Sequence, residues 1–386
     1  MRIKFWMVLA CVLLALGALT GCFWFSLPPN VNEGTVELAP GDPDVEAFSL
    51  DTRGLSRVSE IIVIGRVLNV TSLQETTPEG GLIFTDAEID VQETLKGECS
   101  KKVIVRTLGG QAGDLVMVVS HEPHFRVGET VVLFLAPSPF GQGRYGVCGA
   151  VRGKMTVEDG KILEMPLTLE ELVGRITRAL HSQDIGPDPY FIPLDEEYSS
   201  VPMGELAPLA YRYDDVRWPG DFVNVKYYIN ASDPWVSPIT ASAETWNAVG
   251  SKLVFQYAGK IARKGGIRDG YNVIDATTNY GPTGWPARTI CWYNRLGTNG
   301  GYYYDLVECD TQVNYYYRWF IGSDPRGFDA QNVLTHEFGH WINLGDLYRP
   351  KWSELTMYGY TSYGETKKRT LEASDKAGIL AVYGAR

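Results

Sequence analysis

The sequence is poor in histidine, in basic residues and in long apolar runs. Only five of its 386 residues are histidine, so few imidazoles are available for any metal site. Lys and Arg number 35 against 46 Asp and Glu, and the formal net charge of −11 argues against a nucleic-acid-binding protein, which needs a basic face for phosphate contacts. One long apolar run, at the N-terminus, excludes a protein that crosses a membrane many times. The content of 45% hydrophobic and 21% charged residues is typical of a globular chain, and this length predicts two or three domains.

The N-terminal segment has the layout of a secretory signal. Arg2 and Lys4 precede an apolar run over 5–19, which is too short for a comfortable transmembrane helix. The run ends in Leu-Thr-Gly-Cys22, which resembles the lipobox of bacterial lipoproteins. The resemblance implies that a signal peptide over 1–21 is removed and that Cys22 receives a lipid. The protein would then be exported and anchored to the cell membrane or outer membrane, facing away from the cytoplasm. A plain signal peptide with a chance cysteine is the alternative.

Four cysteines remain beyond Cys22, namely Cys99, Cys148, Cys291 and Cys309. An even number of cysteines in an exported protein is typical of disulfides, and four cysteines allow three pairings. The pairing that keeps each bridge within one domain joins the first two to each other and the last two to each other. Free buried thiols are the alternative. A cysteine metal site is not expected, because no C-x-x-C spacing occurs.

The first half of the chain divides into a tether and a β-rich module. A proline-containing tether is predicted over 22–44, and the module over 45–182, where glycines separate short apolar runs. These runs predict strands of a small barrel or sandwich at 61–67, 102–106, 115–119 and 130–135. An amphipathic helix over 169–180 closes the module.

The second half consists of a linker and a mixed unit. Residues 183–210 contain several prolines among acidic residues and tyrosines, and they are interpreted as an interdomain linker. Residues 211–386 predict an α/β unit, because the run 223–229 alternates like a strand and 238–249 has the apolar spacing of a helix. The whole chain is therefore expected to be of the α+β class, with a β-rich barrel or sandwich followed by an α/β unit.

The segment that carries chemistry is His336-Glu-Phe-Gly-His340. Asp329 can cap a helix that starts at Ala330, and on that helix the two imidazoles face the same side with Cβ atoms about 5–6 Å apart. That separation suits two nitrogens on one Zn²⁺, and Glu337 is placed to hold the metal-bound water as a general base. A surface helix that happens to carry two histidines is the alternative.

A catalytic zinc needs a third protein ligand and one open position. The other three histidines all lie in the β-rich module, so a third ligand within the second unit cannot be histidine. Asp346 can return to the metal if the helix stops at Asn343 and the chain reverses there. Asparagine is, after glycine, the residue that best tolerates the left-handed conformation of such a stop.

The segment 336–346 resembles the metzincin signature H-E-x-x-H-x-x-G-x-x-H/D, with aspartate in the last place and Asn343 where glycine is usual. The segment 353–358 resembles the Met-turn of that family, with Met357 as the apolar cushion beneath the metal. Residues 370–384 resemble the last helix of its matrixin branch. The resemblance covers the second unit and does not cover the β-rich module.

The resemblance implies a zinc endopeptidase that hydrolyses peptide bonds in exported proteins. One catalytic Zn²⁺ would be held by His336, His340 and Asp346. Glu337 would be the general base on a zinc-bound water. The family fold implies a mixed five-stranded sheet whose edge strand binds an extended protein or peptide substrate through backbone hydrogen bonds, and this strand is expected within 302–317.

Two further groups of polar residues are candidates for binding ions. Ca²⁺ could bind Asp275, Asp305 and Asp310, although solvated loop carboxylates are the simpler interpretation because an oxygen cage needs six or more ligands. The segment 121–124, His-Glu-Pro-His, is interpreted as a polar loop between two strands in preference to a metal-binding pair. Pro123 forbids a regular helix there.

Two rival functions stay open. The first is a non-catalytic, surface-binding lipoprotein whose second unit is a latent or decayed peptidase, although the intact H-E-x-x-H segment argues against decay. The second gives the main role to the β-rich module, as an inhibitor or as a module that binds the cell wall or a partner. Latency through a cysteine switch is not supported, because no PRCG-like segment occurs. The expected partners are a protein or peptide substrate and, through the lipid, the membrane.

Overall fold

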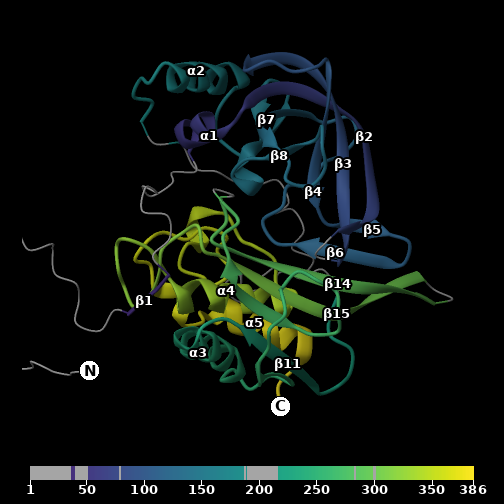
Figure 1. Cartoon of the computed structure of the whole chain (residues 1–386), viewed down its shortest axis with the longest axis vertical. Helices are drawn as coiled ribbons and strands as arrows, with labels where there is room; N and C mark the ends of the chain where they lie inside the picture. The colour runs from purple at the N-terminus through teal and green to yellow at the C-terminus, as the bar shows by residue number, and fades with distance from the viewer. Residues whose placement is uncertain are drawn as a thin grey trace, which may run out of the picture.

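This computed structural model describes residues 36–39, 51–77, 80–186, 188, 216–281, 284–298 and 301–386. The predicted signal peptide, the lipidation site Cys22 and most of the predicted tether and linker lie outside the described residues. Within the described ranges, no helix is long and apolar enough to cross a membrane. The described chain forms an N-terminal unit, drawn uppermost in Figure 1, and a C-terminal unit below it.

The N-terminal unit is a closed β-barrel with two helices packed against it. Its strands follow the order β10-β9-β7-β2-β3-β4-β8, and an additional pairing of β7 with β8 closes the ring. Of the two architectures expected for 45–182, the structure therefore has the barrel. The strands of this sheet are β2 (Ile61–Thr77), β3 (Gly80–Lys96), β4 (Lys102–Leu108), β7 (Thr130–Pro137), β8 (Tyr145–Val147), β9 (Lys154–Glu158) and β10 (Lys161–Ile162).

Alternation along β2 gives the barrel wall two apolar faces. Ile61 and Val63 belong to the cluster in the barrel interior. Ile62 and Ile64 point outwards, into a second cluster that the helices cover. The predicted helix over 169–180 is confirmed, and its N-terminus has a capping box. The two covering helices are α1 (Thr52–Val58) and α2 (Leu169–Leu180).

The predicted disulfide between Cys99 and Cys148 is wrong, because both thiols are free. Cys99 packs against the interior cluster of the barrel, whereas Cys148 packs against the outer cluster under the helices. The barrel wall therefore separates the two sulfur atoms. The other predicted pairing, Cys291 with Cys309, is present.

A hairpin leaves the barrel and joins the C-terminal unit. It consists of β5 (Gly110–Ala112) and β6 (Leu115–Val119), and it starts where Gly109 and Gly110 have φ angles of +106° and +130°. Glycine alone adopts such angles freely, and a Cβ atom on Gly110 would lie 2.4 Å from the hydroxyl oxygen of Ser72. Strand β6 pairs with β14 (Ala287–Thr298) of the C-terminal unit, so one sheet runs through both units (Figure 1).

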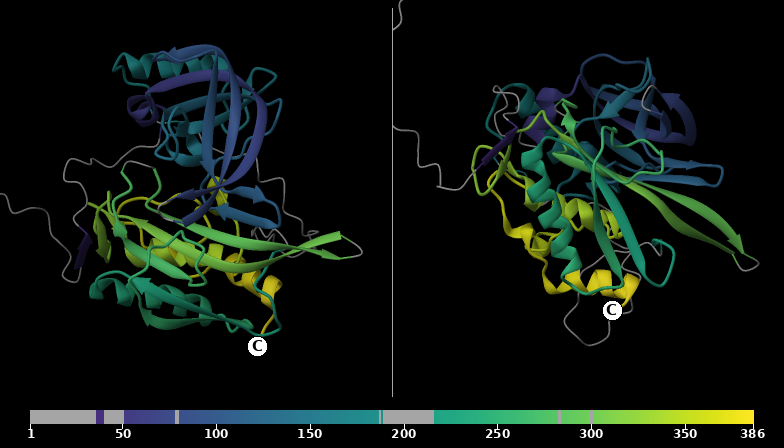
Figure 2. Two further views of the ribbon diagram at one scale, coloured as in Figure 1. Left: turned by 45° about the vertical axis from the view of Figure 1, so that its right-hand side comes forward. Right: turned by 60° about the horizontal axis from the view of Figure 1, so that its bottom comes forward.

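The C-terminal unit is built on a mixed five-stranded sheet of order β12-β11-β13-β15-β14, which β6 and β5 extend. Only β14 is antiparallel to its neighbour within the five. The expectation that the edge strand lies within 302–317 is wrong, because β15 pairs on both sides and β14 is the edge. Figure 2 shows β14 and β15 extending as a long hairpin beyond the rest of the sheet. The other strands are β11 (Val223–Asn230), β12 (Leu253–Lys260), β13 (Val273–Thr278) and β15 (Gly301–Asn314).

Tryptophan side chains fix the helices of the C-terminal unit. The indole N–H of Trp246 donates to the carbonyl oxygen of Thr335 at 2.8 Å, which ties helix α3 to helix α4. Strand β1 pairs with β16, so residues 36–39 of the predicted tether belong to the folded C-terminal unit. The helices are α3 (Val236–Asn247), α4 (Ala330–Trp341) and α5 (Ala373–Tyr383). The short elements are β1 (Val36–Ala39), β16 (Trp319–Ile321), β17 (Phe328–Asp329) and the 3₁₀ helices η1 (Ala150–Gly153), η3 (Asp233–Trp235), η4 (Pro350–Trp352) and η5 (Lys367–Arg369).

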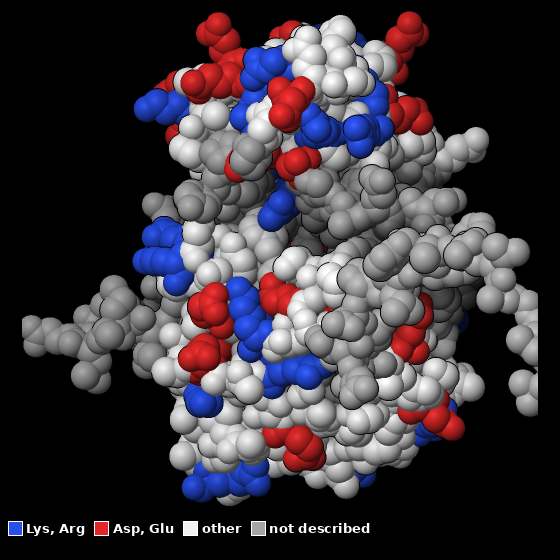
Figure 3. All heavy atoms as spheres, turned by 90° about the vertical axis from the view of Figure 1, so that its left-hand side faces the viewer, with Lys and Arg blue, Asp and Glu red and all other residues white. Residues whose placement is uncertain are grey.

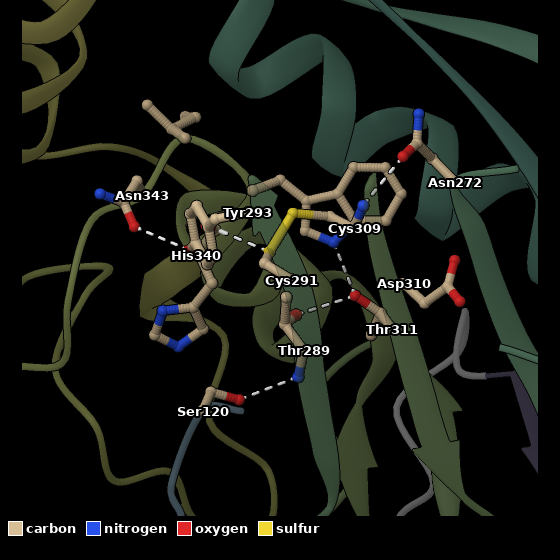
Figure 4. Close-up of a disulfide and its surroundings, with 12 residues drawn as sticks. Ser120, Asn272, Thr289, Cys291, Tyr293, Cys309, Asp310, Thr311, His340 and Asn343 are labelled. Atoms are coloured by element: carbon tan, nitrogen blue, oxygen red, sulfur yellow. Dashed lines mark hydrogen bonds between the residues drawn. A yellow bond between two sulfur atoms is a disulfide. The ribbon is translucent and has the colours of Figure 1, made fainter. Parts of the chain in front are cut away.

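The disulfide joins directly paired positions of β14 and β15 (Figure 4). Cys291 and Cys309 are both buried, and the sulfur of Cys291 lies 3.9 Å from the carbonyl oxygen of His340 on α4. The bridge therefore lies directly behind that helix. A cross-link over a loop of this length stabilises the folded state by about 3 kcal/mol, mainly by restricting the unfolded chain.

Replacing both Cys291 and Cys309 by alanine should lower the free energy of unfolding by about 2–4 kcal/mol. Urea denaturation followed by tryptophan fluorescence measures this change. Cys99→Ala is the control, because it removes a free thiol, and its effect should stay below about 1 kcal/mol. A double variant as stable as the wild-type protein would contradict the prediction.

Candidate metal centre

Helix α4 presents two histidines and a glutamate to the N-terminal unit. The predicted cap is confirmed, since the carboxylate of Asp329 accepts the backbone N–H of Asn332 at 2.8 Å. His336 and His340 are one helical turn apart, and their Nε2 atoms lie 3.1 Å from each other. Glu337, between them in sequence, is buried. The helix thus places two imidazole nitrogens at one point beside a carboxylate.

The chain reverses directly after α4, as the sequence predicts. Asn343 has a φ of +70°, in the left-handed region, and the next N–H, of Leu344, donates to the carbonyl oxygen of Gly339 at 3.0 Å. The hydroxyl of Tyr293 on β14 donates to the side-chain oxygen of Asn343 at 3.0 Å (Figure 4). This reversal returns Asp346 to the histidines.

Asp346 completes a triangle of ligand atoms. Its Oδ1 atom lies 3.1 Å from Nε2 of His336 and 3.5 Å from Nε2 of His340. Donor atoms on a tetrahedral Zn²⁺ with bonds of about 2.0–2.1 Å stand roughly 3.3–3.4 Å apart. The three atoms therefore have nearly the spacing of three corners of such a tetrahedron.

Both histidine rings are oriented by backbone carbonyl groups. Nδ1 of His336 donates to the carbonyl oxygen of Thr356 at 2.8 Å, and Nδ1 of His340 donates to that of Leu344 at 2.8 Å. A carbonyl oxygen only accepts, so each Nδ1 carries the proton and each Nε2 presents its lone pair to the triangle. Bonds of this kind fix the tautomer and the orientation of metal-ligating histidines.

The carboxylate of Asp346 also fits a ligand position. The hydroxyl of Tyr348 donates to its Oδ2 atom at 3.0 Å. The Oδ1 atom is buried and has no hydrogen-bond partner. Burying an oxygen of this kind without a partner is costly, and a cation at the centre of the triangle would satisfy it.

Met357 packs against the turn of α4 that connects the two histidines. A Cβ atom on Gly339 would lie 2.1 Å from the sulfur of Met357, so glycine is required for this contact. The carboxylate of Asp375 on α5 holds the backbone of the turn by accepting the N–H groups of Thr356 at 3.0 Å and Met357 at 3.3 Å. Met357 is buried and packs against the turn that carries the two histidines, where the resemblance to the Met-turn leads us to expect an apolar side chain.

Glu337 is oriented by a residue of the edge strand. The hydroxyl of Thr289 on β14 donates to its Oε2 atom at 2.7 Å, while Oε1 lies 3.7 Å from Nε2 of His121. Burial raises the pKa of Glu337, but the interaction with His121 and the charges of the other imidazoles outweigh burial and lower it. The carboxylate is therefore ionised at neutral pH and can accept a proton.

His121 of the N-terminal unit is the fourth member of the group. The ligating atoms of His121, His336, His340 and Asp346 all lie within 4.8 Å of one another. Nδ1 of His121 lies 3.2 Å from Oδ2 of Asp346, and its ring stacks on that of His336 with centroids 5.6 Å apart. As predicted, the segment 121–124 is a loop between two strands, β6 and β7, and His121 does not form a metal pair with His124. The sequence does not indicate that His121 would join His336, His340 and Asp346. Among the described residues, this is the only such group that could hold a metal ion.

The charges of the group favour a cation. Burial lowers the pKa of His121, but the carboxylates beside it outweigh burial and raise it to about 10. Burial lowers the pKa of His336 to about 4. Asp346 keeps a pKa well below its usual range in spite of burial, because the charges of His121 and His340 lower it. Two buried carboxylates thus require positive charge, which protons on the imidazoles or a metal ion supply.

A cavity of about 370 Å³ lies beside the group. Both units contribute to its lining, which includes Val333 and Glu337 of α4, Tyr360 and Tyr363 of the segment after Met357, and Arg152 of η1. The guanidinium group of Arg152 stacks over the ring of Tyr360 at 3.7 Å. Figure 3 shows one face of the molecule hollowed between the two units.

The structure does not bring the three calcium candidates together as a site. Asp310 is buried, and its carboxylate accepts three backbone N–H groups, those of Gly266, Ile267 and Val273. Asp275 is also buried and accepts bonds from its own surroundings, including the hydroxyl of Thr277. These carboxylates hold the loop before β13, and their oxygens are already satisfied. Asp305 lies further along β15, where its backbone forms an isolated β-bridge with that of Arg217.

Comparisons with known proteins add little to this geometry. No family model matches the chain, and no curated protein matches it. One solved structure that matches, "Structure of Myroilysin", is 12% identical over 44% of this chain and 83% of its own length, with a TM-score of 0.24. A similarity at that level carries no argument about fold or activity. A metal centre is therefore supported by the geometry of three histidines and one aspartate that could hold a metal ion.

Asp346→Ala should weaken metal binding by at least about 100-fold, because it removes a ligand. Removing a residue that only hydrogen-bonds to a ligand typically weakens metal binding by about 10- to 100-fold. Zinc content after dialysis against a weak chelator measures the affinity. Tyr348→Phe is the matched control, because it removes the hydrogen bond to Oδ2 and keeps the carboxylate. Its affinity should fall by about tenfold. Unchanged zinc content in Asp346→Ala would show that Asp346 is not a ligand.

Gly339→Ala should disturb the metal group through Met357, because the added methyl group overlaps the methionine sulfur. We expect a loss of about 1–3 kcal/mol in the free energy of unfolding. Metal binding should weaken by at least about tenfold. Gly174→Ala on α2 is the control, since its Cβ atom would have no neighbour closer than 3.5 Å. Zinc titration and denaturation of both variants provide the measurement, and normal zinc affinity in Gly339→Ala would refute the prediction.

Proposed function

We propose that residues 211–386 form a matrixin-like metzincin domain and that the protein is a zinc endopeptidase. The observation that carries this proposal is the triangle of His336, His340 and Asp346 with the ionised Glu337 beside it. The likeness of 336–346 to the metzincin signature supports the same assignment. The substrates would be extracytoplasmic proteins or peptides, because the segment ending at Cys22 supports an exported, lipid-anchored protein.

When bound, Zn²⁺ would act as a Lewis acid toward water and toward the scissile carbonyl group. Thr289 holds Oε2 of Glu337, so Oε1, which faces His121 of the metal group, would take a proton from water and return it to the leaving amine. The backbone carbonyl groups behind the two histidines fix the tautomer and the orientation of both rings, so that each Nε2 atom faces the metal position. Each of these groups is set in place before substrate arrives, because hydrogen bonds within the C-terminal unit already hold Glu337 and both histidines.

Strand β14 supplies the edge on which an extended peptide would bind. An edge strand offers unpaired N–H and C=O groups, and a peptide can add to it as one more antiparallel strand. The catalytic Glu337 is bonded to Thr289 of this strand, so a peptide on β14 would pass the metal group. The neighbouring cavity would take one side chain of that peptide.

A second candidate is a non-catalytic protein whose metal ion is structural. The specific observation in its favour is that His121 raises the number of protein ligands to four. Zinc sites with four protein ligands are usually structural, whereas catalytic sites keep one position open. The two candidates differ in whether Glu337 has any catalytic task.

The test is cleavage of fluorescently labelled unfolded casein by zinc-loaded protein. It uses the wild-type chain and His121→Ala, because His121 lies within the ligand group. We expect cleavage by at least one of them, abolished by a chelator and reduced by at least about 100-fold in the corresponding Glu337→Gln variant. Glu337→Gln should still bind one zinc ion. If neither chain cleaves while each binds one zinc ion, the metal is structural and the peptidase proposal fails.

A further inference from the structure

Strand β6 of the N-terminal unit occupies the free edge of β14. Five residue pairs are in antiparallel register, from Leu115 opposite Asn294 to Val119 opposite Ile290. Ser120 extends the pairing, because its backbone N–H donates to the carbonyl oxygen of Thr289 at 2.9 Å. Its hydroxyl oxygen accepts the backbone N–H of Thr289 at 2.8 Å (Figure 4). A peptide substrate would need the same backbone groups. The edge is therefore filled by the protein's own chain.

The residue that follows Ser120 turns into the metal group. His121 has a φ of +63°, an uncommon conformation for a residue with a side chain. Its carbonyl oxygen accepts the backbone N–H of Val151 at 3.1 Å, which ties the loop to η1. The imidazole is thereby placed against Asp346 and His336. Strain of this kind at a ligand group is typical of positions held for a functional reason.

Contacts beside the metal group hold the N-terminal unit in place. On the β14 side, the carboxylate of Glu122 lies 3.5 Å from the buried guanidinium group of Arg288. At the cavity, Arg152 of η1 stacks over Tyr360. The N-terminal unit thus contacts the C-terminal unit at three places around the site, namely the edge strand, the metal group and the cavity.

We propose that the N-terminal unit keeps the site latent, with His121 as the fourth protein ligand of the metal and β6 in the place of a substrate. This inference rests on the proposed peptidase function. A catalytic metal needs one position open to water and substrate, and His121 would close it. Because ligand and site belong to one chain, the imidazole competes at a high effective concentration without needing a tight contact of its own. Loss of the His121 ligand opens the metal position and allows cleavage, and full activity requires in addition that β6 leave β14.

The test uses the full chain loaded with Co²⁺, whose visible spectrum reports its coordination. Acetohydroxamate is the probe, because it binds only where the metal has an open position. We expect one Co²⁺ per chain in the wild type and in His121→Ala, and acetohydroxamate binding at least about 100-fold tighter in the variant. His124→Ala is the matched control from the same loop and should behave as wild type, since His124 is not in the group.

Cleavage of unfolded casein by the zinc-loaded chains is the second readout. His121→Ala should cleave at least about tenfold faster than the wild type. His121→Gln is a second variant, should the alanine chain not fold; it keeps a polar side chain of similar length and should also bind the probe more tightly than the wild type.

The results separate latency from function. Equal probe affinity in the wild type and in the His121 variants overturns the inference. Cleavage by the wild type at the rate of His121→Ala retains the peptidase and also overturns latency. Tight probe binding by His121→Ala without cleavage by either chain supports His121 as a ligand and overturns the peptidase. Absence of bound Co²⁺ in both chains overturns both proposals.

Discussion

Two carboxylates buried among three imidazoles are the constraint on which the rest of this structure depends. Asp346 and Glu337 are buried, and an ionised carboxylate in such a place requires a positive partner. Helix α4 carries two of the imidazoles, the reversal at Asn343 brings Asp346 to them, and strand β14 orients Glu337. The N-terminal unit supplies the third imidazole, His121. The site is thus assembled from elements that are far apart in sequence, and the balance of charge in it depends on all of them.

Those parts of the site that depend on local sequence could be predicted. The cap at Asp329, the spacing of His336 and His340 and the left-handed Asn343 are each determined within a few residues, by hydrogen-bond satisfaction and backbone sterics. The pairing of Cys291 with Cys309 was expected because it keeps the bridge within one domain, and the structure places the two cysteines opposite each other in one hairpin. Alternation in the run 223–229 predicted strand β11, whereas the mixed five-stranded sheet was expected from the resemblance to metzincins.

The parts that depend on contacts between units could not be predicted. Nothing near His121 in sequence shows that β6 would leave the barrel, because its apolar run fits a barrel strand equally well. The sharpest local signal was Gly109-Gly110, where two successive glycines allow the departure. The edge strand was misplaced for a similar reason, since strand order is a property of the whole sheet. Cys99 and Cys148 share one domain, and only the fold shows the barrel wall between them.

The sheet shared by the two units has a consequence for how the protein unfolds. The strands β5 and β6 are covalently part of the barrel and hydrogen-bonded to the sheet of the other unit. Melting of either unit would expose the edge of the other, together with the apolar side chains of Met117, Ile290 and Trp292 that pack between them. The domain boundary that the sequence predicts near residue 183 therefore does not separate two units that unfold independently. Heat should melt the two units in one cooperative transition, and a protease that nicks the hairpin should loosen both.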